Sequence, residues 1–96
     1  MYLDDFTIPG YSLSEDYAAW NTKILQQCIN NKRNIYLPNK IPINDTLTIS
    51  KDYNGHTILG GALNMVADNK PIIMFKDNLI EEVTLKNTQL NYKIPN

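Results

Sequence analysis

Short apolar segments, each cut off by a turn residue, run through most of the chain after residue 33. In the stretch 34–49 the first segment stops at Pro38, the second contains Pro42, and Asn44-Asp45 marks a turn. Proline cannot donate a strand hydrogen bond, so these segments suit strand ends or edges. Residues 46–49 then alternate polar and apolar side chains, the period of a strand buried on one face. The pattern predicts many short strands.

A helical pattern precedes these strands. Apolar residues recur at intervals of three and four within 12–33, which places them on one stripe of a helix. Ser12 and Glu15 have the spacing of a capping box, and Ser14 is an alternative N-cap. We expect Trp20 and Ile24 at the centre of the contact between this helix and the strands. The residues expected to build the cap are Ser12, Glu15, Tyr17, Trp20, Ile24 and Cys28.

The short strands recur at a regular interval. Ile35 and Ile58 lie 23 residues apart, and Val83 follows Ile58 by 25 residues, with asparagine turns inside each interval. A period of about 20–30 residues built from short strands is typical of a solenoid. On spacing alone, a small antiparallel sandwich that carries a helix is the alternative.

Composition narrows the classes of function. The chain has 96 residues and a net charge of −1, which suits one small domain without the basic face that nucleic acids require. No apolar run approaches the ~18 residues of a membrane span, so we expect no membrane insertion. The single cysteine, Cys28, excludes an internal disulfide and a zinc site built from cysteines. The first residues lack a signal-peptide pattern, so we expect export by another route or a chain cut from a longer protein.

Four motifs follow one another in the chain, and their order is more informative than any one of them. They are Asp16-Tyr17-Ala18-Ala19-Trp20, Asn34-Ile35-Tyr36-Leu37-Pro38, Leu47-Thr48-Ile49 and Thr57-Ile58-Leu59-Gly60-Gly61. Over residues 12–90, this order resembles the N-terminal part of pectate-lyase-like right-handed parallel β-helix proteins. That architecture occurs in bacteriophage tailspikes and in many polysaccharide lyases and hydrolases.

The resemblance implies a mainly β fold. We expect an irregular lead-in over 1–11, an amphipathic capping helix over 12–33 and the first two to three rungs of a right-handed parallel β-helix over 34–96. A helix laid over the first rung would cover strand edges that otherwise favour association. We also expect the chain to be part of a longer protein, or its other end to be closed by a second chain.

The candidates for chemistry are few. Glu81-Glu82 are adjacent, so on a strand their side chains face opposite sides, and Asp45 is most simply a turn former. His56 is the only histidine, and Cys28 has no histidine near it in the sequence. We therefore assign no catalytic, cofactor-binding or metal-ligating residue. Tyr53, at an expected turn tip, is the candidate for contact with a sugar.

The resemblance implies a structural N-terminal segment of a phage tailspike-like, receptor-binding protein that recognises bacterial surface polysaccharide. The parent protein would be a homotrimer in the virion tail, with possible lyase or glycoside hydrolase activity on residues outside this segment. One alternative is the N-terminal segment of a secreted, extracellular bacterial polysaccharide lyase or hydrolase. Another is a free-standing interaction domain that oligomerises through its exposed end.

Overall fold

The structure is a computed structural model that describes residues 11–37, 39–76, 84–86 and 88–91. A single-turn 3-10 helix, η2 (Glu15–Tyr17), leads into the helix α1 (Ala18–Asn30). A second 3-10 turn, η3 (Lys51–Tyr53), lies among short strands. The strands are β1 (Ile35–Tyr36), β2 (Lys40–Ile43), β3 (Leu47–Ile49), β4 (Thr57–Leu59), β5 (Ala62–Met65), β6 (Ile73–Phe75), β7 (Thr84–Lys86) and β8 (Gln89–Asn91).

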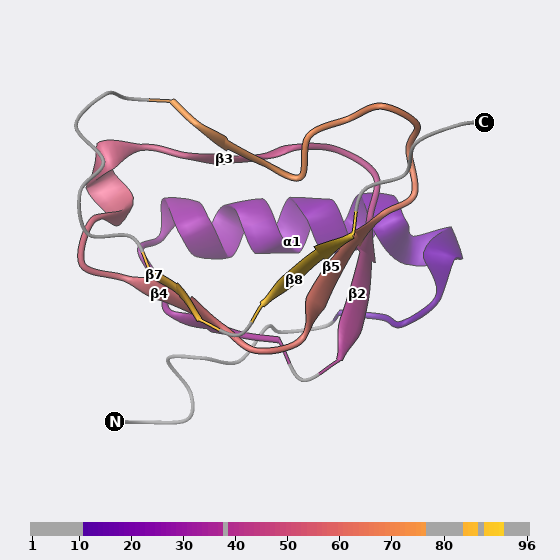
Figure 1. The fold of residues 1–96 in the computed structure, drawn as a ribbon, viewed down its shortest axis with the longest axis horizontal. Coiled ribbons are helices and arrows are strands. Elements are labelled where there is room, and N and C mark those ends of the chain that lie inside the picture. Colours follow the sequence, from indigo (N-terminus) through magenta and orange to yellow (C-terminus); the bar gives the residue numbers. More distant parts are fainter. Residues whose placement is uncertain (1–10, 38, 77–83, 87, 92–96) are drawn as a thin grey trace.

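The strands form three small sheets, with the orders β1-β4-β7, β2-β5-β8 and β3-β6. Each pair in the described part of the chain is parallel; Ile35 lies beside Ile58, Lys40 beside Ala62 and Leu47 beside Ile73. Figure 1 shows the three sheets on different sides of the view, with α1 running across its middle; α1 packs against β2 and β3, the first strands of their sheets. The parallel pairing excludes an antiparallel sandwich.

The expected right-handed parallel β-helix is wrong as the fold class. The described residues form one α-helix and short strands in three parallel sheets of two or three strands, and they do not show a closed or solenoid form. The sequence period predicts that strands about 20–30 residues apart in the chain pair with each other. It does not define the hand of the connections or the closure of the sheets, and those are the features that distinguish a β-helix.

The helix begins later and ends earlier than its apolar pattern predicts. The Ser14 hydroxyl accepts a hydrogen bond from the Asp16 amide at 3.3 Å, so Ser14 is the N-cap of η2. The Ser12 hydroxyl instead accepts from the Ser14 amide. At the other end Lys32 has a φ of 60°, a left-handed conformation that turns the chain out of the helix.

The core lies between α1 and the sheets. In β3 the burial alternates, with Leu47 and Ile49 inside and Thr48 partly exposed, as expected for a strand covered on one face. The side chain of Tyr53 is buried in the same core. The residues that α1 contributes are Ile24, Leu25, Cys28 and Ile29, and those of the first strands are Ile35, Ile41, Ile43, Leu47 and Ile49.

Candidate functional site

Polar side chains of α1 bind the free backbone of β2 and of the segment before the helix. Asn21 is completely buried, and its amide nitrogen donates to the carbonyls of Ser12 at 2.7 Å and Pro42 at 3.0 Å. Its carboxamide oxygen accepts from the Ser12 amide at 2.9 Å. A buried amide without partners would be costly, so these bonds explain how Asn21 occupies the core face.

Thr22 and Gln26 continue this contact along the edge toward β3. The Thr22 hydroxyl accepts from the Asn44 amide at 2.9 Å. The Gln26 carboxamide accepts from the Thr48 amide at 2.8 Å and donates to the Thr48 carbonyl at 3.0 Å. These two bonds reproduce what a neighbouring strand would supply to Thr48. The helix therefore satisfies the outer edge of β2 and β3 with side chains.

The residues expected at the centre of the cap divide into two groups. Ile24 and Cys28 are buried on the face of α1 that packs on the sheets. Trp20 is 48% exposed and Tyr17 is 56% exposed, so the expectation that Trp20 centres the contact is wrong. Glu15 is exposed in η2. Asn21 lies on the buried face beside Ile24, a role that a hydropathy pattern cannot assign to an asparagine.

Tyr53 is buried and does not lie at an exposed turn tip. Only 1% of the residue is accessible, and its hydroxyl donates to the Arg33 carbonyl at 2.6 Å. Burial, and to a smaller extent the charge of Cys28, raises the pKa of the Tyr53 hydroxyl. Its ring is 5.3 Å from the His56 ring, centroid to centroid. Tyr53 is therefore a core residue in this structure, and its ring is not available for stacking on a sugar.

A cavity of about 330 Å³ lies where α1, β3, η3 and the residue after β6 meet. We call it the α1–β3 cavity. Ile29 supplies an apolar part of its wall. The polar residues that line it are Gln26, Asn30, Thr48, Ser50, Asp52 and Lys76. They come from three separate segments of the chain, 26–30, 48–52 and 76, and no local sequence motif could have identified them together.

The backbone positions the charged groups of this cavity. The Lys76 amide donates to the Ile49 carbonyl at 2.8 Å, which places Lys76 beside the end of β3. The Asp52 amide donates to the Ser50 hydroxyl at 3.3 Å, which starts η3 at the same point. Both charged residues are exposed, and neither makes an ion pair with another described residue.

The acidic residues considered from the sequence do not converge. Asp45 accepts from the Thr46 amide at 2.8 Å and pairs with Lys70 at 3.2 Å, and these contacts lower the pKa of its carboxyl group, the Thr46 amide most. Glu81-Glu82 lie outside the described residues. Within the described part of the chain, no group of three histidine, cysteine, aspartate or glutamate side chains could hold a metal ion. No described helix has the length and apolar character to cross a membrane.

Comparisons of the chain with protein-family models, with curated proteins and with solved structures found no match.

Proposed function

We propose that the chain is a structural segment of a tailspike-like, receptor-binding protein and that it contributes to recognition of bacterial surface polysaccharide. The motif order described above supports the class of protein. The single observation that carries the structural role is the hydrogen bonding of α1 to the edge of β2 and β3. A helix that satisfies one sheet edge leaves the opposite strands as the side on which the protein can be extended or joined.

Burial differs between the two sides of the sheets. Ile49 in β3 is completely buried, whereas its register partner Phe75 in β6 is 49% exposed. Leu63 in β5 is 1% exposed, whereas its partner Leu90 in β8 is only partly buried. At these two pairs of positions, the apolar side chain in the strand farther from α1 is the more exposed one. This asymmetry fits a segment that builds a larger assembly.

Binding to intact glycans tests this proposal. We expect the chain, immobilised on a biosensor, to bind at least one member of a panel of purified capsular polysaccharides and O-antigens. We expect no new reducing ends, because glycosidic cleavage uses a pair of carboxylates and the lining of the α1–β3 cavity at residues 26–30, 48–52 and 76 includes only that of Asp52. Failure to bind any member of a broad panel would contradict the proposed recognition. Release of reducing ends would contradict the structural role.

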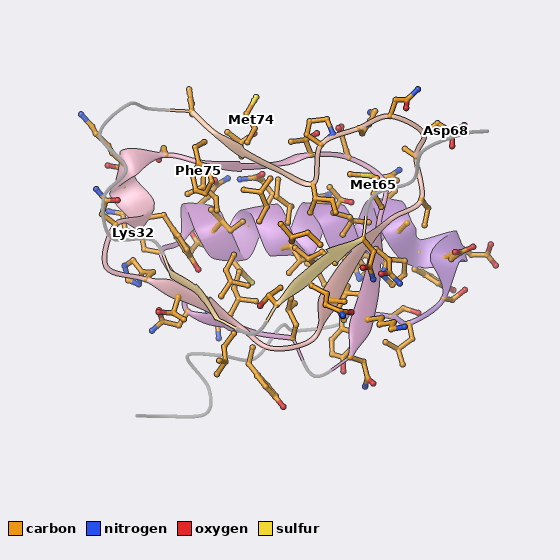
Figure 2. All side chains as sticks on the ribbon, in the orientation of Figure 1. Lys32, Met65, Asp68, Met74 and Phe75 are labelled. Atoms are coloured by element: carbon orange, nitrogen blue, oxygen red, sulfur yellow. The ribbon has the colours of Figure 1, made fainter. Side chains whose placement is uncertain are left out.

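Self-association through β6 is a second candidate function. Met74 is 50% exposed and Phe75 49% exposed; Figure 2 shows Met74 pointing outward from β6 and Phe75 toward the interior. Exposed apolar groups beside a strand edge that has no partner among the described residues favour association. We expect a trimer in multi-angle light scattering and a monomer for Phe75→Ser, with Tyr36→Ser as the control on another sheet. A wild-type monomer at every concentration would contradict this function.

A further inference from the structure

We infer that the α1–β3 cavity is a binding site for one neutral pyranose unit of a glycan. This inference rests on the proposed function, because it names the place at which this chain would contact polysaccharide. The cavity is separate from Tyr53, which the sequence singled out for that role. Its volume of about 330 Å³ is at the lower end of the roughly 300–1,000 Å³ of small-molecule sites, so it suits a single sugar unit.

Part of the cavity wall is held in place by hydrogen bonds within the protein. The Gln26 carboxamide binds both backbone groups of Thr48 and also donates to the Asn30 carboxamide oxygen at 3.0 Å. With these three bonds the Gln26 side chain is fixed between α1 and β3. A wall fixed before binding lowers the conformational entropy that a ligand must remove.

Other polar groups of the wall have capacity left for a ligand. The Asn30 amide nitrogen has no partner among the described residues, because only its carboxamide oxygen is bonded. The Ser50 hydroxyl accepts from the Asp52 amide and keeps its own proton for donation. The Asp52 carboxylate adds acceptors and the Lys76 ammonium group adds donors. The cavity thus presents both kinds of hydrogen-bonding group.

This combination favours a sugar over an ion. Each sugar hydroxyl both donates and accepts, so it uses a wall with both functions. A phosphate group offers mainly hydrogen-bond acceptors, and repulsion by the Asp52 carboxylate would offset its attraction to the Lys76 ammonium group. A divalent cation would find one carboxylate and would be repelled by Lys76. The two charges sum to zero, and an uncharged pyranose is the ligand class that matches the set.

The test is a titration of the ¹⁵N-labelled chain with methyl α- and β-pyranosides of glucose, galactose and mannose, followed by NMR. We expect one or more of these probes to shift the Asn30 side-chain amide and the Thr48 backbone amide. Asp52→Asn and Lys76→Met should each weaken binding about tenfold, as loss of a charged hydrogen bond does. The matched controls are Asp45→Asn and Lys70→Met, which alter the exposed ion pair outside the cavity and should leave affinity unchanged. All four positions are exposed, and the same spectra report whether each variant is folded.

The inference is overturned if no methyl pyranoside shifts the Asn30 amide, if the cavity variants bind as tightly as the controls, or if inorganic phosphate shifts the same signals and the sugars do not. Polysaccharide binding that is unaffected by Asp52→Asn and Lys76→Met would contradict the assignment of the cavity as the binding site. It would still support the proposed function. Pyranoside binding in the cavity without binding to any bacterial polysaccharide would support the cavity as a sugar site and contradict the proposed function.

Discussion

Two buried polar side chains, Asn21 and Tyr53, tie different parts of the chain together. Asn21 joins α1 to the residues before it and to β2, and Tyr53 joins η3 to the carbonyl after α1. From the sequence, Trp20 was expected in the contact between the helix and the strands, where Asn21 lies instead, and Tyr53 was expected at an exposed turn tip. Hydropathy places a residue by its average preference, whereas a fully hydrogen-bonded polar group can be buried without penalty.

The Tyr53 hydroxyl should contribute measurably to stability. Tyr53→Phe removes the bond to the Arg33 carbonyl, and we expect a loss of about 1 kcal/mol in the free energy of unfolding. Urea denaturation measures the change. Tyr36→Phe is the matched control, because Tyr36 is 44% exposed, and it should be near neutral. Equal effects of the two substitutions would show that the buried bond carries no stability.

Alkaline pH should destabilise the chain through the same region. Burial raises the pKa of the Tyr53 hydroxyl and of the Cys28 thiol, the latter against a smaller opposing effect of Arg33. The folded state therefore keeps protons that the unfolded state releases, and stability is complete below the ordinary pKa values of these groups. We expect the free energy of unfolding to fall as the pH rises above them. Tyr53→Phe should flatten this slope, and a slope that it leaves unchanged would count against the Tyr53 contribution.

Among the elements, α1 packs on the sheets and also hydrogen-bonds the backbone at the edge of β2 and β3. Its apolar face could be predicted from the spacing of Ile24 and Cys28, and its contact with the strands followed from that face. The bonds from Thr22 and Gln26 to Asn44 and Thr48 could not be predicted. They depend on which strand edge lies under the helix, and that is a property of the tertiary structure.

Gln26→Met should separate the hydrogen bonding of α1 from its packing. Methionine keeps a similar length but leaves the Thr48 amide and carbonyl without their side-chain partners, so we expect a loss of about 1–3 kcal/mol. Gln27→Met is the control on the exposed face and should change stability by less than about 0.5 kcal/mol. Thermal and urea unfolding measure both. Indistinguishable variants would mean that water replaces the lost bonds at no cost.

The turn between β4 and β5 depends on a glycine. Gly61 has a φ of 58°, and a Cβ there would lie 2.6 Å from the Asn39 carbonyl oxygen and in contact with that of Leu37. Gly55 has a φ of 89° but open space around it. We expect Gly55→Ala to cost about 1–2 kcal/mol from backbone strain alone and Gly61→Ala to cost clearly more. Denaturation curves that rank the two the other way would contradict this account of the turn.

At the level of the whole molecule, the sequence predicted the local elements better than their assembly. The Asn44-Asp45 turn marked where β2 stops, and the alternation in 46–49 marked β3. The right-handed parallel β-helix that the resemblance implied was wrong as a fold class. Strand spacing is a one-dimensional signal and carries no information on handedness. The α1–β3 cavity was missed for a related reason, since it exists only where separate elements meet.

The central claim is that, within the described part of the chain, the sheets are hydrogen-bonded by α1 on one side, and the far edge of β6 has no described partner strand. Amide hydrogen exchange followed by NMR tests it most directly, by comparing Thr48 in β3 with Phe75 in β6. The Thr48 amide is bonded to Gln26, whereas the Lys76 amide bonds to β3, so by the alternation of a strand the Phe75 amide faces away from it. We expect slow exchange at Thr48 and fast exchange at Phe75. Fast exchange at Thr48, or equally slow exchange at Phe75, would contradict the claim.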